Sequence, residues 1–182
     1  MRDADLQQKR LVAAAVDVGI AIALWAVFML VSMVLGLGSS FASGDSGLAT
    51  GAAVFLPRIV GFVGALVSLG YILGRDVLAG DRSFGKKLQK IRVLGPGGQP
   101  VTFVDSAKRN AIFAIGSVLT FLSATLQLVP CLGDAVACLL FPLWLGGALL
   151  GLVAVVLELV KITQEPEGVR MGDQFAQTRV VA

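Results

Sequence analysis

The sequence predicts an all-α membrane protein, a bundle of about four transmembrane helices with a small hairpin of two short strands in one connecting loop. The first observation is composition: 56% of residues are hydrophobic and 15% are charged, whereas soluble domains carry about 25% charged residues. The second is a set of four long apolar stretches, each near the roughly 20 residues that cross a bilayer. They cover residues 11–37, 54–74, 111–129 and 136–160. The third is that basic residues are confined to alternate connecting segments.

The first stretch, residues 11–37, contains an aspartate inside an apolar run. The run is too long for the apolar core of a cleaved signal peptide, so we expect a retained span. Asp17 follows Arg10 by about two helical turns, which puts both side chains on one face. A carboxylate at a span centre costs about 2.5–3.5 kcal/mol and normally faces a partner inside the bundle. From its position alone, Asp17 fits two interpretations equally well. One is a structural ion pair or buried hydrogen bond, and the other is a proton or cation site.

The second stretch, residues 54–74, leads into a basic loop at residues 75–110. Apart from Arg58, every Lys and Arg lies in the N-terminal segment, this loop or the tail at residues 161–182. The positive-inside rule therefore predicts that both termini and the loop are cytoplasmic. Basic side chains near a membrane surface contribute about 1 kcal/mol each toward anionic lipid headgroups. The side chains expected to contact such headgroups or a partner are Arg82, Lys86, Lys87, Lys90 and Arg92.

Two patterns lie within this loop. "GDRSFGKK" at residues 80–87 fits G-x-x-x-x-G-K, but it lacks the Ser or Thr and the flanking strand and helix of a phosphate-binding loop. "LQKIRVL" and "QPVTFV" alternate apolar and polar residues around "GPGG" at residues 95–98, which predicts the cytoplasmic β-hairpin. Asp105 or Ser106 is expected to cap the third span.

The last two stretches flank a short turn, "VPCLGD" at residues 129–134. Cys131 and Cys138 lie at this turn, either as two thiols or as an oxidised pair. Glycines four apart, at Gly70 and Gly74 and again at Gly147 and Gly151, allow close helix packing.

Several functions lack the residues that they need. The chain has no histidine, the commonest metal ligand and proton shuttle near neutral pH. No nucleophile–base pair, metal-ligand set or cofactor fingerprint is visible. We therefore expect a non-enzymatic protein without metal or cofactor, which binds no nucleic acid.

Three ordered segments, "RLVAAAVDVGI", "RDVLAGDRSFGKKLQKIRVLGPGGQPVTF" and "RMGDQFAQTRVV", resemble segments of the RDD family of small membrane proteins. "RLVAAAVDVGI" is similar to that family's first-span signature, which maps its arginine onto Arg10 and its first aspartate onto Asp17. "RDVLAGDRSFGKKLQKIRVLGPGGQPVTF" is similar to the family's cytoplasmic loop, and "RMGDQFAQTRVV" to its closing segment.

The resemblance implies a second aspartate, which we assign to Asp173, with Asp76 as the alternative. A histidine often precedes the closing aspartate in this family, and Gly172 stands there instead. The family's usual plan is nearer three spans than four. Its members are associated with cation/proton exchange and with accessory roles beside other membrane proteins.

Two functions follow as expectations for a multi-pass protein of the bacterial inner membrane. The first is a non-catalytic accessory or scaffold subunit, in which Arg10, Asp17 and Asp173 form a polar lock. Its partners would be the lipid bilayer, anionic headgroups, and other subunits or further copies of the chain. The alternative is a transporter, or part of one, that exchanges small cations for protons through Asp17.

Overall fold

The computed structural model describes residues 2–41, 47–78, 80, 82–129, 133–164 and 169–181. Four helices are long: α1 (Arg2–Phe41), α2 (Gly47–Gly74), α4 (Phe103–Gln127) and α5 (Gly133–Gln164). Each contains a segment long and apolar enough to cross a membrane. The smaller elements are α3 (Phe84–Leu88), β1 (Arg92–Leu94), the 3-10 turn η1 (Pro96–Gly98), α6 (Met171–Phe175) and β2 (Arg179–Val181). The predicted bundle of four long helices is confirmed.

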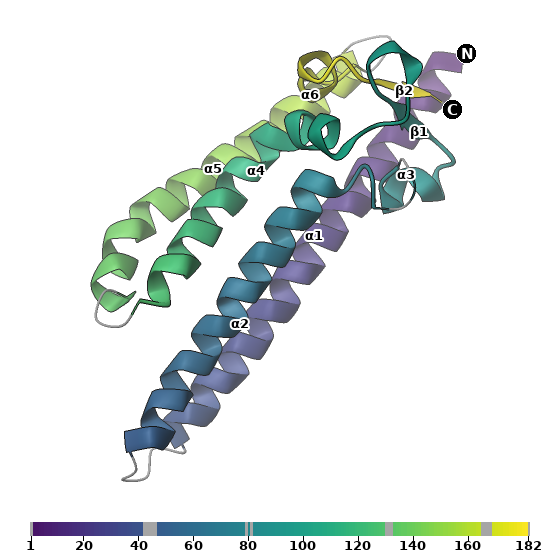
Figure 1. Cartoon of the computed structure of the whole chain (residues 1–182). Coiled ribbons are helices and arrows are strands. Elements are labelled where there is room, and N and C mark those ends of the chain that lie inside the picture. Colours follow the sequence, from purple (N-terminus) through teal and green to yellow (C-terminus); the bar gives the residue numbers. More distant parts are fainter. Residues whose placement is uncertain are drawn as a thin grey trace.

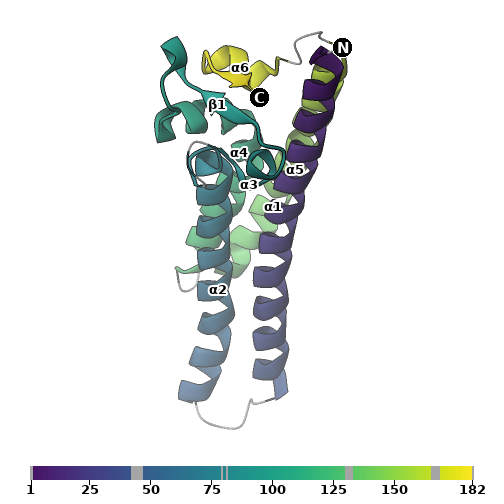
Figure 2. The same ribbon diagram turned by 90° about the vertical axis from the view of Figure 1, so that its right-hand side faces the viewer.

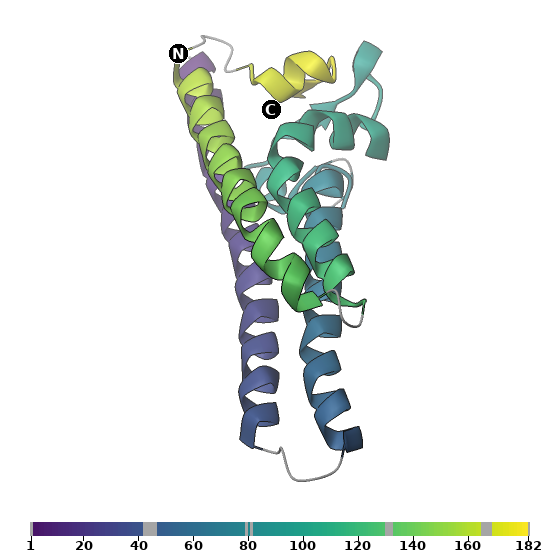
Figure 3. The ribbon, with the colours of Figure 1, turned by 90° about the vertical axis from the view of Figure 1, so that its left-hand side faces the viewer.

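Each long helix packs against the next one along the chain, whereas α1 and α5 touch little. Figures 1 and 3 show these neighbours running side by side in alternating directions. The small elements gather at one end of the bundle, together with the start of α1 (Figures 1 and 2). We call this end, formed by residues 75–102 and 169–181 and the helix segments that they contact, the polar end.

α1 is longer than a bilayer requires. Its 40 residues extend about 60 Å at 1.5 Å per residue, against a hydrocarbon core of about 30 Å. α1 is therefore long enough for its first turns to extend out of the hydrocarbon core at the polar end.

Small residues allow close contacts between neighbouring helices. A Cβ on Gly64 of α2 would lie 2.6 Å from the Phe28 Cβ on α1, and a Cβ on Gly116 of α4 would lie 3.1 Å from the Gly147 carbonyl on α5. Of the glycines at the predicted spacing, Gly147 packs tightly, whereas a Cβ on Gly151 would meet nothing within 4 Å. The spacing thus marks a real helix contact at only some of its positions.

The predicted hairpin is wrong in its second strand. β1 forms, but it pairs antiparallel with β2 of the C-terminal tail, in a register that places Val93 opposite Val180. The segment after the turn makes a single bridge, between Leu94 and Pro100. Proline has no N–H to donate to a ladder, and α4 begins at Phe103, so no second strand develops there.

The start of α4 is set by Thr102. The Thr102 hydroxyl accepts from the Asp105 N–H at 3.2 Å, and the Asp105 carboxylate accepts from the Thr102 N–H at 3.0 Å. This is a capping box, so Asp105 occupies the third helical position and the cap itself is Thr102. The helix therefore starts eight residues before the apolar stretch predicted at residue 111 and carries polar side chains in its first turns.

The turn between α4 and α5 is described only in part. Cys138 is an exposed free thiol in α5, whereas Cys131 lies outside the described residues.

Candidate functional site

Among the residues that the structure describes, nine charged side chains come together at the polar end, from five helices and the loop after α2. Each is at most about one-tenth exposed. We call them the polar cluster: Arg10, Asp17, Arg75, Asp76, Lys86, Arg109, Glu158, Arg170 and Asp173. A buried charge is costly unless it is paired, so the partners of each side chain determine what this site can do.

Asp17 fastens the loop to α1. Its Oδ2 accepts from the Ser83 hydroxyl at 2.5 Å and its Oδ1 accepts from the Gly85 N–H at 2.9 Å, and the residue is 2% exposed. Ser83 is the N-cap of α3, which lies beside α1 near the end of α2 (Figure 2). Gly85 permits this approach, because a Cβ there would overlap the Ala13 carbonyl. Asp17 therefore lies level with the end of α2 rather than midway along the spans.

Arg10 faces a different segment, the C-terminal tail. Its NH2 donates to the Val180 carbonyl of β2 at 3.3 Å. Val180 belongs to a small apolar core with Ala13, Ile91 and Val93, which lies between the two-stranded sheet and α1. The two residues predicted to share one face of α1 thus hold the tail and the loop.

Asp76, just after α2, is the most enclosed carboxylate. It contacts the Lys86 ammonium, accepts from Asn110 Nδ2 at 3.1 Å and lies 3.8 Å from Arg109 NH1. Burial raises its pKa, but Lys86 and Arg109 act more strongly in the opposite direction, so the pKa of Asp76 lies well below its usual range. Asp76 is therefore an ionised anchor for α3 and α4.

Arg109 joins this anchor to the tail. Its NH2 lies 2.6 Å from Asp173 Oδ1 on α6, and the side chain is 1% exposed. Burial raises the pKa of Asp173, and the nearby Arg109 and Arg170 outweigh that effect and lower it. Gly172 makes the contact possible, because a Cβ there would overlap the Arg109 carbonyl.

Glu158 and Arg170 connect α5 with the start of α6. Glu158 Oε1 accepts from the Gly172 N–H at 3.2 Å, and Glu158 Oε2 lies 3.9 Å from Arg170 Nε. Burial lowers the pKa of Arg170, but Asp173, Asp76 and Glu158 raise it above its usual value. Arg170 therefore stays cationic at every physiological pH.

Arg75 completes the polar cluster at the end of α2. Its Nε and NH2 both donate to Asn110 Oδ1, at 2.9 and 2.5 Å, and its guanidinium lies 5.4 Å from the centre of the Phe113 ring. Burial is the main cause that lowers the pKa of Arg75. The amide of Asn110 on α4 therefore accepts from a cation, Arg75, and donates to a carboxylate, Asp76.

The RDD family model matches residues 7–177, nearly the whole chain. The chain belongs to the RDD family. No match was found among curated proteins or among solved structures. In this RDD protein the two candidates for the second aspartate, Asp76 and Asp173, lie on either side of Arg109. Arg10 and Asp17 lie on the neighbouring face of α1 and reach the tail and the loop.

Sequence reasoning missed several members of this RDD cluster. Arg75, Arg109 and Glu158 were not expected there, and neither was the polar partner Asn110. A signal existed: Ser106 and Asn110 lie four residues apart at the start of the third span, and their side chains share one helix face.

The basic residues expected at a lipid surface separate into two groups. Lys87, Lys90 and Arg92 are exposed and Arg82 is partly buried, whereas Lys86 is 5% exposed inside the polar cluster. Among the described residues, no group of three or more metal-ligating side chains comes together.

Lys86 of this RDD protein is expected to make stability rise with pH. Burial and the nearby Arg109 lower the pKa of Lys86, and Asp76 raises it by less, so the pKa falls from 10.5 to about 7. In the unfolded chain the ordinary pKa returns, so between these values the unfolded state binds more protons. The free energy of unfolding then increases by at most about 1.4 kcal/mol per pH unit above pH 7. Thermal unfolding in detergent from pH 6 to 9 measures this slope.

The control for this prediction is the neighbouring lysine. Lys86→Gln should flatten the pH dependence, whereas Lys87→Gln, at an exposed position, should leave it unchanged. Equal slopes in wild type and Lys86→Gln would contradict the assignment.

Proposed function

We propose that the protein is a non-catalytic accessory or scaffold subunit of a membrane complex. The observation that carries this proposal is the environment of Asp17. Both oxygens of its carboxylate accept hydrogen bonds, from Ser83 and from Gly85, and the residue is buried. A carboxylate that is held in this way by two donors of its own chain supports a structural lock rather than an open ion site.

The rest of the polar cluster supports the same role. Asp76 joins the end of α2 to α3 and α4, and Asp173 joins α6 to α4. Arg10 adds the tail strand through Val180. Two segments that lie about 90 residues apart in the chain are thereby fixed to the helices as one cap. A rigid cap of this kind can present a constant surface to another protein.

The distribution of charge along the spans argues against the alternative of cation/proton exchange. Within the four membrane-spanning segments, Arg58 is the charged residue that lies away from the polar end. Its NH1 donates to the Gln127 carbonyl near the end of α4 at 3.4 Å. Ionisable side chains at successive depths are the usual mark of an ion path, and the described spans carry no charged side chain between Arg58 and the polar cluster.

The setting that we propose is the bacterial inner membrane, with both termini and the polar end in the cytoplasm. The positive-inside rule supports this orientation, because the polar end carries most of the basic residues. Lys87 is exposed on α3 beside the exposed apolar side chains of Phe84 and Leu88. A short helix with this composition favours contact with anionic headgroups. The further partners that we propose are other membrane subunits or a second copy of the chain.

Substituting Asp17 by asparagine tests the role. An asparagine offers one oxygen where Asp17 offers two, so a charge-assisted hydrogen bond to α3 is lost. We expect the free energy of unfolding to fall by about 1.5–3 kcal/mol, measured by thermal or chemical unfolding in detergent. Cation-driven proton flux in proteoliposomes, with Na⁺, K⁺ or Li⁺, is expected to be absent from wild type and variant alike.

The control is Asp5→Asn, because Asp5 is an exposed carboxylate of the same helix that pairs with Lys9 four residues on. It should change stability by less than about 0.5 kcal/mol. A wild-type flux that disappears in a stable Asp17→Asn protein would overturn the subunit role in favour of transport.

A further inference from the structure

A cavity of about 410 Å³ lies among α1, α2, α4 and α5, next to the polar cluster. Most of its wall is apolar and includes Ala21, Ile22 and Trp25 of α1 and Val155 of α5. A volume of this size lies in the range of sites that hold small organic ligands.

The cavity opens sideways, between α1 and α5, which touch little. Ile22 and Trp25 on one side and Leu159 on the other both line it and are exposed. All three belong to membrane-spanning segments. The opening therefore faces the lipid of the bilayer, which is the direct source of an occupant.

One end of the cavity is charged, with Arg75, Arg170 and Glu158 in its wall. Among the described residues, Arg170 makes two ion pairs, both through Nε, at 3.9 Å to Glu158 and 3.8 Å to Asp173. Its two terminal nitrogens can therefore donate to a group in the cavity.

A second cavity of about 20 Å³ adjoins this end and shares Arg75 and Arg170 with it. Five cations and one carboxylate line it, namely Arg10, Arg75, Lys86, Arg109, Arg170 and Asp17. In the polar cluster as a whole, four arginines face four carboxylates, and Lys86, whose pKa is about 7, adds a fifth positive charge at and below neutral pH. The charged end therefore has a positive excess that an anion would balance.

We propose that the larger cavity binds one anionic phospholipid of the surrounding bilayer. One acyl chain lies between α1 and α5, and the phosphate group lies at Arg170 and Arg75. Basic pockets between membrane helices are suited to acidic headgroups, and the positive excess favours such a headgroup over a zwitterionic one. This site is separate from the exposed loop lysines, and it does not depend on the subunit role.

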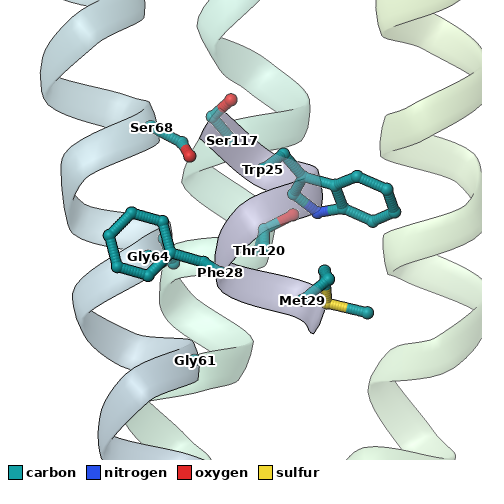
Figure 4. A pocket seen from close by; sticks show the side chains of 9 residues that line it. Trp25, Phe28, Met29, Gly61, Gly64, Ser68, Ser117 and Thr120 are labelled. Atoms are coloured by element: carbon teal, nitrogen blue, oxygen red, sulfur yellow. The ribbon is translucent and has the colours of Figure 1, made fainter. Parts of the chain in front are cut away.

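Trp25 supplies a spectroscopic reporter for this site. Figure 4 shows that the Trp25 ring and the Phe28 ring extend from α1 on opposite sides. The pocket drawn there has a volume of about 80 Å³ and shares Trp25, Ser68 and Ser117 with the larger cavity. The chain has two tryptophans, so Trp144→Phe leaves Trp25 as the single emitter.

The experiment uses the full chain with Trp144→Phe in phosphatidylcholine nanodiscs. Phosphatidylglycerol with brominated acyl chains is added at increasing mole fraction, and quenching of Trp25 fluorescence is recorded. We expect saturable quenching at a low mole fraction, whereas brominated phosphatidylcholine should quench only in proportion to its abundance. Equal quenching by the two brominated lipids would overturn the proposal.

Two variants test the two ends of the site. Arg170→Gln removes a charged donor. We therefore expect the mole fraction of brominated phosphatidylglycerol that gives half-maximal quenching to rise roughly tenfold. The matched control is Arg92→Gln, at an exposed basic position. Gly151→Leu fills the apolar part, and a Cβ at this position meets nothing within 4 Å. The Gly151→Leu protein should stay folded and lose saturable quenching. If Arg170→Gln does not fold, the result for Gly151→Leu tests the site on its own.

A free fatty acid is the competing occupant with the same chemistry. A brominated fatty acid that saturates Trp25 quenching and is not displaced by phosphatidylglycerol would overturn the choice of a phospholipid. An unchanged response in both Arg170→Gln and Gly151→Leu would overturn the site itself.

Discussion

Replacing Arg109 by methionine should lower the free energy of unfolding by about 3–5 kcal/mol. The substitution keeps the volume of the side chain nearly constant but leaves Asp173 without its closest cation, at 2.6 Å, and Asp76 with one cation fewer. Both carboxylates are almost fully buried, so water cannot replace the lost partner. Unfolding in detergent measures the loss. Limited proteolysis should also cleave residues 169–181 much faster, because α6 loses its contact with α4.

Lys108→Met is the matched control for this substitution. Lys108 precedes Arg109 in the same helix but is exposed, so the same change of residue type should cost less than about 0.5 kcal/mol. Similar stabilities of the two methionine variants would show that the contact between Arg109 and Asp173 does not hold the tail in place.

Gly85→Ala should destabilise the protein by about 3 kcal/mol, although it adds one methyl group. The new Cβ would overlap the Ala13 carbonyl, which is backbone and cannot rotate away. α3 must then move from α1, and the hydrogen bond from the Gly85 N–H to Asp17 lengthens. The overlap costs about 1–3 kcal/mol and the weakened bond to a charged acceptor a similar amount. Thermal unfolding in detergent provides the measurement.

Gly61→Ala provides the comparison, because a Cβ on Gly61 meets nothing within 4 Å. In a helix interior this change should stabilise by about 0.5–1 kcal/mol. A Gly85→Ala protein as stable as Gly61→Ala would mean that α3 does not pack on α1 in the membrane.

The bundle was predictable because hydrophobic stretches of span length carry their own signal. Each long helix includes or overlaps one of the four predicted ranges. β1 was also predictable, since it lies in the run "LQKIRVL", where apolar and polar residues alternate just before the turn at residues 95–98. These features depend on neighbouring residues in the chain, which sequence patterns report well.

The partners of these elements were not predictable, since they lie far along the chain. The turn at residues 95–98 favours a local hairpin, yet the strand that pairs with β1 is β2, in the tail. For the same reason Asp17 was expected to face Arg10, whereas its carboxylate accepts from Ser83 and Gly85. Hydropathy also placed the start of the third span at residue 111, which left Arg109 out of the expected site.

The long sequence separations within the polar cluster have a consequence for the order of synthesis. Asp17 leaves the ribosome 66 residues before Ser83, which is a delay of roughly 3–13 s at 5–20 residues per second. Arg10 precedes Val180 by 170 residues, a delay of roughly 9–34 s. Arg10 and Asp17 are therefore translated long before the groups that they contact in the folded protein, and the last strand to be translated completes the site. A chain that ends before α6 would lack Asp173, the carboxylate closest to Arg109, so we expect such a chain to be less stable than the complete one.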